Sequence, residues 1–376
     1  MKALVKRDDL SYGLRTAARA ISSRTTLPVL HNVLIATDES RLRISATDLE
    51  LAITVWVDAD VHSEGATTVP ARIFSDFIGS LHTDGEVKLT YDDSAQSLHV
   101  SSGSSHATIK CIEADEFPPL PAPEISEGVR IPAGEIKRMV RQVVFAASAD
   151  DARPVLTGVF VKVEGNEMTA AASDGFRLSV QKVAVENPND ASLKLIVPAR
   201  AWSEVGRAIQ DENQSVVMVL PSGRNQVVFR VGDNVEVVSQ LIEGEYPPYE
   251  QIIPRDYRTR TVVATSRLLA ACKQAEIFAR EGSQSVRLEI IPGDDAPGEV
   301  LVSGSSKETG ASEDRVPAAV EGEPLIIAFN VRYLREALEA IPSQEVALET
   351  IQPRSPALLR PVGDDTFLHI IMPMHL

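Results

Sequence analysis

The stretch Val69-Pro70-Ala71-Arg72 precedes apolar residues at helical spacing, and the same pattern occurs twice more along the chain. The later occurrences are Val197-Pro198-Ala199-Arg200 and Phe329-Asn330-Val331-Arg332. The three arginines are separated by nearly equal lengths of chain. Each occurrence predicts a strand end followed by a helix. We expect proline in the first helical turn of two copies and Asn330 as the N-cap of the third.

Three other features recur at nearly the same spacing. Residues 5–10, 131–136 and 263–268 each lead into a second helical run. Thr47-Asp48-Leu49 is repeated as Ser173-Asp174-Gly175, and the EFPP run at 116–119 is repeated as the EYPP run at 245–248. The chain is therefore predicted to contain three repeats of one unit, with boundaries at 1–128, 129–258 and 259–376.

Each repeat is predicted to have two helices and about eight strands. The helical runs are residues 5–20, 70–82, 132–148, 198–210, 265–281 and 329–341. Strand-period segments fill most of the remainder, separated by turn clusters such as Gly232-Asp233-Asn234 and Pro292-Gly293-Asp294-Asp295. The predicted fold class is α+β, with helices on one face of antiparallel sheet in each repeat.

The composition excludes several protein classes. The chain has 376 residues, 44% of them hydrophobic, which is enough for packed cores. Apolar runs are too short for a transmembrane helix, and the start lacks the apolar run of a signal peptide, so we expect a cytoplasmic protein without membrane association. The two cysteines, Cys111 and Cys272, are far apart in the sequence and predict reduced, part-buried thiols rather than a disulfide framework or a zinc site.

The charges are unevenly distributed. The whole chain has a net charge of −16, but the six predicted helices together have a net charge of +6. This reversal indicates a basic helical side that faces a polyanion. Aromatic residues are only 5% of the chain, so stacking on single strands is disfavoured and duplex nucleic acid fits better.

Several motifs of the chain resemble those of a known family, the bacterial sliding clamps, which are the beta subunits of DNA polymerase III. The resemblance spans the chain, and the motifs that carry it are Arg24 to Leu30, Ala66 to Arg72, Ser173 to Leu178, Gly244 to Tyr249 and Met372 to Leu376. It implies a ring-shaped homodimer that encircles duplex DNA and tethers a polymerase for processive synthesis. It also implies that a separate ATP-driven clamp loader opens the ring, since the chain has no Walker motif.

The resemblance assigns residues to three surfaces. The DNA-facing set would be Arg24, Arg72, Lys137, Arg141, Arg153, Arg200 and Lys273. The seam of the dimer would contain Ala107, Ile109, Ile277 and Phe278, where Ala107 is smaller than the residue usual in the family. The third surface would be a groove that binds short hydrophobic peptides of the DNA polymerase III alpha subunit, the clamp loader, other polymerases and repair factors. Its residues would be Leu156, Ser173, Gly175, Phe176, Arg177, Leu178, Pro247, Ile252, Pro356, Ile371, Met372, Pro373 and Met374.

The residues leave two alternatives open. Phe176 and His375 replace the histidine and arginine common in the family, which is compatible with an accessory clamp that confers antibiotic tolerance. Asp48 and Asp174 are compatible with an acid-dependent hydrolase, but each follows Thr or Ser in a turn, which favours a structural role. The sequence has no recognisable catalytic or metal-binding motif, so we expect a non-enzymatic processivity factor without cofactor or metal.

Overall fold

The structure is a computed structural model, and it describes residues 1–22, 25–82, 85–120, 128–293 and 297–375. These residues form two compact units. The first contains residues 1–136, 185–189 and 200–241, and the second contains residues 137–184, 190–199 and 242–376. Each unit has its own twelve-stranded antiparallel sheet. Within the described residues, no helix is long and apolar enough to span a membrane.

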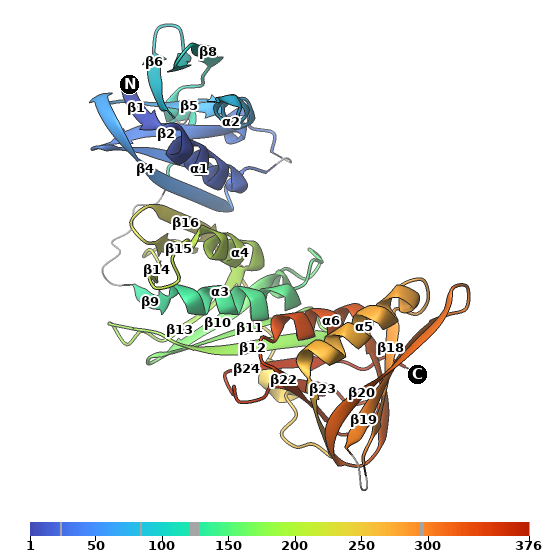
Figure 1. Cartoon of the computed structure of the whole chain (residues 1–376). Helices are drawn as coiled ribbons and strands as arrows, with labels where there is room; N and C mark the ends of the chain where they lie inside the picture. The colour runs from blue at the N-terminus through green and yellow to red at the C-terminus, as the bar shows by residue number, and fades with distance from the viewer. Residues whose placement is uncertain (23–24, 83–84, 121–127, 294–296, 376) are drawn as a thin grey trace. The chain divides into compact units, whose positions relative to one another are not determined.

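The first repeat begins with a strand that leads directly into a helix. Its helices are α1 (Arg7–Ala17) and α2 (Ala71–Ser80). Its strands are β1 (Lys2–Lys6), β2 (Asn32–Asp38), β3 (Arg41–Thr47), β4 (Leu51–Ser63), β5 (Ala66–Pro70), β6 (Glu86–Asp92), β7 (Ser97–Ser102) and β8 (Ser105–Lys110). Helix α1 packs on β3 and β4, and Figure 1 shows α1 and β4 in the blue part of the chain.

The second repeat has the same order of elements. Its helices are α3 (Ala133–Gln142) and α4 (Ala199–Ala208). Its strands are β9 (Val129–Pro132), β10 (Gly158–Glu164), β11 (Glu167–Ser173), β12 (Arg177–Ala184), β13 (Leu193–Pro198), β14 (Ser215–Val219), β15 (Gln226–Val231) and β16 (Val235–Gln240). Part of its core is the pair Trp202 and Phe229, whose ring centroids are 4.7 Å apart.

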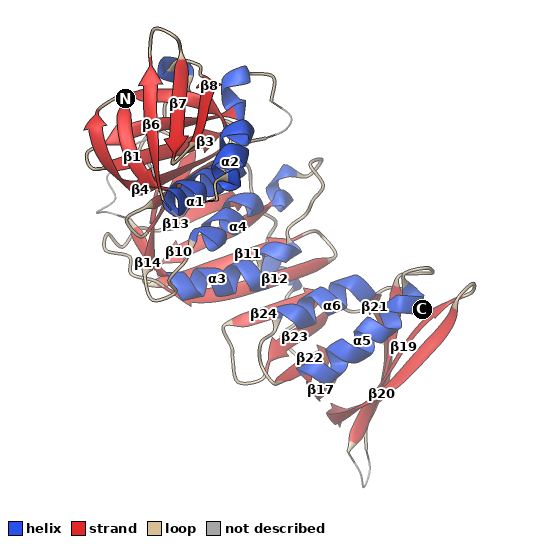
Figure 2. Cartoon of the chain, turned by 45° about the horizontal axis from the view of Figure 1, so that its top comes forward, coloured by secondary structure: helices blue, strands red, loops and turns tan. Residues whose placement is uncertain are grey.

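The third repeat has this order once more. Its helices are α5 (Thr265–Ala279) and α6 (Val331–Ala340), which lie side by side in Figure 2. Its strands are β17 (Thr259–Ala264), β18 (Ser285–Ile291), β19 (Gly298–Ser306), β20 (Gly310–Gly322), β21 (Leu325–Asn330), β22 (Glu345–Thr350), β23 (Ala357–Pro361) and β24 (Phe367–Ile371). The expectation of two helices and eight strands per repeat is therefore confirmed for the residues that the structure describes.

Several details differ from the sequence prediction. The prediction includes Val5 in a helix, but Val5 pairs with Val87 in the sheet, and α1 begins at Arg7. Pro70 and Pro198 are the last residues of β5 and β13, so each precedes its helix instead of lying in the first turn. In the described residues both are edge strands, β5 pairing with β2 and β13 with β10, and an edge strand tolerates the missing N–H. The predicted N-cap is confirmed, since the Asn330 side chain accepts hydrogen bonds from two backbone amides of α6. Asp294 and Asp295 of one predicted turn lie outside the described residues.

The sheets continue from one repeat into the next by the same strand pairing. β4 of the first repeat pairs with β16 of the second, and β12 of the second repeat pairs with β24 of the third. In both cases the fourth strand of one repeat pairs with the eighth strand of the following repeat. The flanking backbone hydrogen bonds also correspond: Gln240 N donates to Glu50 O over 2.8 Å, and Met372 N donates to Phe176 O over 2.9 Å.

Candidate functional site

The second unit contains an apolar groove next to the pairing of β12 with β24. Its volume is about 280 Å³. Three apolar side chains on its rim are exposed, with relative accessibilities of 59% for Phe176, 48% for Ile252 and 39% for Met372. The lining residues are Leu156, Ser173, Gly175, Phe176, Arg177, Tyr246, Pro247, Pro248, Tyr249, Gln251, Ile252, Ile370 and Met372.

The turn between β11 and β12 forms one wall of the groove. The Asp174 carboxylate accepts hydrogen bonds from the backbone amides of Phe176 at 2.9 Å and Arg177 at 3.1 Å. The Ser173 hydroxyl donates to the carbonyl of Arg177 over 2.7 Å. Gly175 has φ +93°, a conformation that strongly favours glycine. Asp174 is thus fixed in a turn, and Asp48 makes the corresponding bonds to the amides of Glu50 and Leu51.

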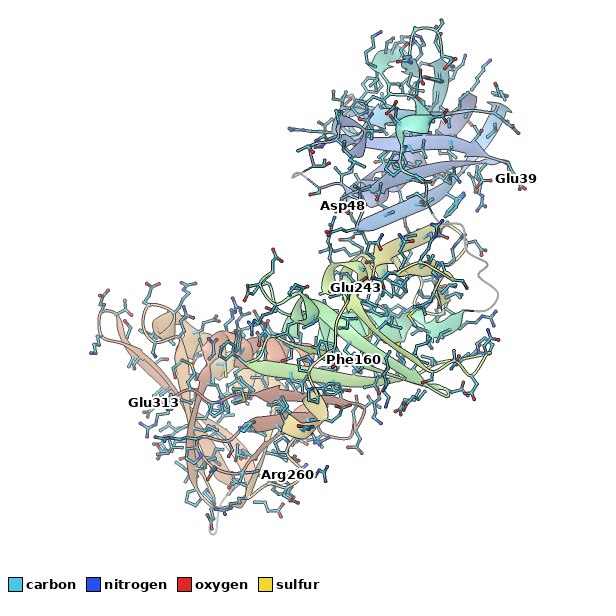
Figure 3. The ribbon with its side chains drawn as sticks, turned by 180° about the vertical axis from the view of Figure 1, so that it is seen from behind. Glu39, Asp48, Phe160, Glu243, Arg260 and Glu313 are labelled. Atoms are coloured by element: carbon cyan, nitrogen blue, oxygen red, sulfur yellow. The ribbon has the colours of Figure 1, made fainter. Side chains whose placement is uncertain are left out.

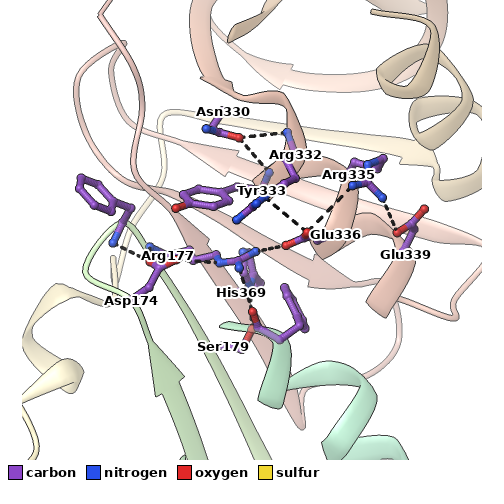
Figure 4. Close-up of polar contacts among 12 residues, drawn as sticks. Asp174, Arg177, Ser179, Asn330, Arg332, Tyr333, Arg335, Glu336, Glu339 and His369 are labelled. Atoms are coloured by element: carbon purple, nitrogen blue, oxygen red, sulfur yellow. Dashed lines mark hydrogen bonds and ion pairs between the residues drawn. The ribbon is translucent and has the colours of Figure 1, made fainter. Parts of the chain in front are cut away.

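Arg177 lies beneath this turn and is almost completely buried, with 6% of its surface exposed. Its Nε donates to Asp174 at 3.1 Å, its Nη1 to Glu336 at 2.5 Å, and its Nη2 to the carbonyl of Phe145 at 2.8 Å (Figure 4). The guanidinium also lies over the ring of Tyr333, 4.3 Å from its centroid. Each of the three guanidinium nitrogens of this buried cation has a partner, so Arg177 holds the turn in place and contributes little open surface to the groove.

His369 completes the polar cluster in Figure 4. It is fully buried on β24, and its Nδ1 lies 2.7 Å from the hydroxyl of Ser179. Burial, with the nearby positive charge of Arg177, lowers the pKa of His369 to about 3. The imidazole is therefore neutral at physiological pH and acts as a polar contact between the second and third repeats.

Aromatic residues support the opposite wall of the groove. Phe160, labelled in Figure 3, stacks on Tyr246 with a centroid distance of 5.3 Å and meets Tyr249 at 6.0 Å. Burial raises the pKa of both tyrosines, in the case of Tyr249 to about 12. The sequence prediction missed Tyr246, Pro248, Tyr249, Gln251 and Ile370 as lining residues. The run from Gly244 to Tyr249 contains three of them and is the signal that could have found them.

Eight of the predicted groove residues line the groove, and five do not. The eight are Leu156, Ser173, Gly175, Phe176, Arg177, Pro247, Ile252 and Met372. The prediction that Ile371 lines the groove is corrected, because Ile371 is buried in the core beneath α5 and α6. Successive side chains of a strand point to opposite faces, so its neighbour Ile370 faces the groove instead. Leu178 is fully buried in a cluster with the lining residues Tyr249 and Ile370, so it supports the floor of the groove from below. The remaining three, Pro356, Pro373 and Met374, are not among the lining residues.

The predicted DNA-facing residues occupy helices or segments that follow helices. Arg72 is on α2, Lys137 and Arg141 are on α3, and Lys273 is on α5, where its Nζ lies 2.9 Å from Glu339. Arg153 follows the short helical segment after α3 and contacts Asp150 at 3.4 Å. Arg24 lies outside the described residues.

Arg200 has a structural partner that the sequence did not predict. Its Nη1 lies 2.5 Å from the Asp48 carboxylate, and its Nη2 donates to the carbonyl of Arg19 over 3.0 Å. The guanidinium thus links the first and second repeats and is only partly available to a polyanion, with 44% of the side chain exposed.

The predicted seam residues differ in accessibility. Ile277 is 63% exposed on α5, and Phe278 beside it is partly exposed. Ile109, on β8, is only 6% exposed within the single chain, and its place in the seam stays a prediction. Ala107, on the same strand, is partly exposed.

The described residues contain no group of three or more His, Cys, Asp or Glu that could hold a metal ion. Cys111 and Cys272 are free thiols, as predicted, and both are buried. Burial raises the pKa of the Cys272 thiol to about 12, so this sulfur is unreactive.

The chain has three repeats of two helices and eight strands, and continuous sheets join them. With the apolar groove at the second junction, this architecture defines the class of three-domain clamp proteins. Three domain profiles of the DNA polymerase III beta subunit match the chain: the N-terminal domain at residues 1–121, the central domain at 130–248 and the C-terminal domain at 250–375. The chain belongs to this family, the sliding clamps of DNA polymerase III, which are processivity factors and not enzymes.

Individual relatives agree over their full lengths. The chain is 34% identical to the beta sliding clamp of Synechococcus elongatus, and 100% of both chains is covered. It is 32% identical to that of Staphylococcus aureus, with 100% of this chain and 99% of the relative covered. Among solved structures, the sliding clamp of Bacillus subtilis superposes with a TM-score of 0.93 at 29% identity, covering 100% of this chain and 99% of the other. The Pseudomonas aeruginosa clamp bound to griselimycin gives 0.92 at 28% identity, with 100% of both chains covered.

Proposed function

We propose that two copies of this chain close head to tail into a ring that encircles duplex DNA. The supporting observation is the strand pairing at the junctions between repeats. Both internal junctions pair the fourth strand of one repeat with the eighth strand of the next. In the described residues, β8 is an end strand of its sheet, and residues 310–317 of β20 pair only with β19. These two strands are the eighth and fourth strands that the single chain leaves without this pairing.

Pairing β20 of one copy with β8 of a second copy is a heterologous contact that closes after two copies. It also removes two exposed strand edges, which are otherwise sites of uncontrolled association. Ile277 and Phe278 at the end of α5, with Ala107 on β8, supply apolar surface to this seam. The repeat boundaries in this proposal are 1–128, 129–258 and 259–376.

The groove is proposed to bind short hydrophobic peptides of the DNA polymerase III alpha subunit, the clamp loader, other polymerases and repair factors. Exposed apolar side chains from three different segments, Phe176, Ile252 and Met372, surround it. The flexible thioether of Met372 suits a surface that accepts several different sequences. A polymerase bound here rebinds its template as a near-intramolecular event, which is the physical basis of processivity.

The DNA contacts are proposed to come from helix-borne cations that neutralise phosphates without reading base sequence. The proposed residues are Arg72, Lys137, Arg141, Arg153 and Lys273, with Arg24 outside the described residues and Arg200 shared with Asp48. A chain of net charge −16 needs such a local concentration of cations to approach DNA. The proposed location is the bacterial cytoplasm.

Retention on two DNA topologies tests the ring. The clamp is loaded by its cognate loader onto nicked circular duplex and onto linear duplex, and retention is measured at about 0.3 M salt. The ring predicts that the protein stays on the circle and slides off the linear DNA. Equal, salt-sensitive loss from both would mean ordinary electrostatic binding and would contradict the ring.

The peptide groove is tested separately by anisotropy with a labelled clamp-binding peptide from the cognate alpha subunit. A Met372→Asp variant is expected to lose binding, because it places a charge in an apolar wall. If the wild-type chain encircles DNA but does not bind this peptide, the accessory-clamp alternative, which Phe176 and His375 suggest, replaces the replicative assignment.

A further inference from the structure

The first junction between repeats contains a guanidinium group with two acceptors and, beside it, a buried carboxylate that other arginines bind. Arg200 bridges the Asp48 carboxylate, in the turn after β3, and the carbonyl of Arg19, just beyond the first helix. The buried carboxylate is Glu204 on α4, which accepts a hydrogen bond from Nη1 of Arg207 and lies 3.9 Å from the Arg19 side chain. The two carboxylates are buried, with 5% of Glu204 and 7% of the Asp48 side chain exposed, whereas 44% of the Arg200 side chain is exposed.

The second junction uses acceptors at the corresponding positions. Arg177 binds the Asp174 carboxylate, the carbonyl of Phe145 and the Glu336 carboxylate. Asp174 and Phe145 follow Asp48 and Arg19 by one and the same offset in the sequence. The acceptors are therefore a property of the repeat.

The helix acids of the two junctions correspond as well, whereas the donors differ. Glu204 lies one helical turn after Arg200 in its motif, and Glu336 lies one helical turn after Arg332 in the third copy of that motif. The donor is an arginine of α4 at the first junction and the first residue of β12 at the second.

Comparable acceptors exist a third time, divided between the two ends of the chain. Asp48 and Asp174 directly follow β3 and β11, whereas β19 is followed by Lys307 and then by Glu308, which is the one carboxylate of the turn Lys307–Thr309 and is exposed. The number of residues from Leu268 to Ile277 equals that from Leu10 to Arg19, so the carbonyl of Ile277 corresponds to that of Arg19. The helix acid that corresponds to Glu204 is Asp76, one turn after Arg72 on α2.

The donor for this third set can be assigned by elimination. The position of Arg177, the first residue of its strand, is occupied by Gly310 in the third repeat, which has no side chain to donate. The position of Arg200 is occupied by Arg72 in the first copy of the motif. Arg72 is 94% exposed, and its ion pair with Asp76 is long, at 3.9 Å. Its charge is thus available to a partner.

The geometry points to a seam contact in which Arg72 of one copy binds Glu308 and the Ile277 carbonyl of a second copy. This inference rests on the proposed ring and names the charged pair that fixes its register. It also reassigns Arg72 from DNA contact to subunit contact. The pair lies beside the apolar patch around Ile277, where part of its water is removed and an ion pair gains strength over an exposed one.

A charge-reversal cycle tests this contact on the full chain without DNA. The variants are Arg72→Glu, Glu308→Arg and the double variant, and the control is Arg15→Glu, which makes the same change at an exposed arginine of α1. The dimer dissociation constant is measured by dilution of fluorescently labelled protein. Each single reversal is expected to raise it by about tenfold, because it juxtaposes like charges at the seam. The double variant is expected to return to within about threefold of wild type.

The outcomes separate the pair from the ring. If Arg72→Glu behaves like Arg15→Glu, or if the double variant does not recover, the pair is refuted while a dimeric wild type still supports the ring. If the wild-type chain remains monomeric at micromolar concentration, the ring itself fails. A loss of DNA retention by Arg72→Glu with an unchanged dissociation constant would return Arg72 to the DNA-facing set.

Discussion

Replacing Arg177 with methionine should open the groove wall by a predictable amount. The substitution keeps an unbranched chain of similar length but removes the guanidinium from Asp174, Glu336 and the Phe145 carbonyl. Removing one partner of a buried ion pair costs about 3–5 kcal/mol. The lower end applies here, since the Glu336 side chain is 27% exposed and keeps Arg332 at 3.6 Å. About 3 kcal/mol corresponds to roughly a hundredfold change in a local opening equilibrium.

Amide hydrogen exchange over residues 173–178 measures this opening directly, because exchange reports local free energy. We expect these amides to exchange roughly a hundredfold faster in Arg177→Met. The control is Arg153→Met, whose ion pair with Asp150 is about half exposed and should contribute under about 1 kcal/mol. If Arg177→Met accelerates exchange no more than this control, the guanidinium does not hold the turn and the reasoning is refuted.

Three further predictions test individual features. Gly175→Ala should weaken binding of the alpha-subunit peptide by about tenfold, because a Cβ at φ +93° lies 3.1 Å from Arg153 Nη1 and costs about 1–2 kcal/mol. The control is Gly165→Ala, at φ +54° in open space. Equal peptide affinities of the two variants would contradict the role of the turn. Asn330→Ala should lower stability by about 1 kcal/mol through loss of the α6 cap, with Asn330→Asp restoring the melting temperature in calorimetry; an unchanged temperature in Asn330→Ala would be the contrary result. His369 has a folded pKa of about 3, below its ordinary value of 6.5, so its unfolded form binds a proton first as pH falls. The contribution of His369 to the free energy of unfolding is thus complete above pH 6.5 and is lost as the pH falls toward 3. Over this range the free energy of unfolding should fall by about 1.4 kcal/mol per pH unit more in the wild type than in His369→Gln. Urea unfolding measures it at each pH, and a parallel pH dependence of the two proteins would refute the prediction.

The repeats and their helices could be predicted from the sequence because both depend on local spacing. The apolar residues after Arg72, Arg200 and Arg332 follow the helical period, and the caps and prolines mark the starts. The helix ends were less predictable. Val5 continues the apolar pattern of α1 but is fixed in β1 by its pairing with Val87, which is distant in sequence. Tertiary hydrogen bonds decided that boundary.

The contents of the groove were predictable only in part, for a different reason. Ile370 and Ile371 are equally apolar, and only the register of β24 against β12 determines which of them faces the groove. In the same way, nothing in the spacing of Arg177, Asp174 and Glu336 shows that one guanidinium reaches both carboxylates. The contact between Arg177 and Glu336 joins distant parts of the sequence and exists only once the second and third repeats are packed together.

The buried cluster below the groove has a counterpart at the first junction. Ala52, Val228 and Val238 form a buried cluster there with Leu120 packed on it, at the repeat positions of Leu178, Leu358, Ile370 and Tyr249. The floor is therefore common to both junctions.

The aromatic wall is not common to both. Phe160, Tyr246 and Tyr249 contact one another at the second junction, whereas the corresponding residues of the first repeat are Leu34, Phe117 and Leu120. Aromatic side chains bury a large area for little loss of conformational entropy, so three of them in contact make a rigid wall. The two junctions thus share their strand pairing and their buried cluster, and the aromatic wall is what differs at the second junction, where the groove lies.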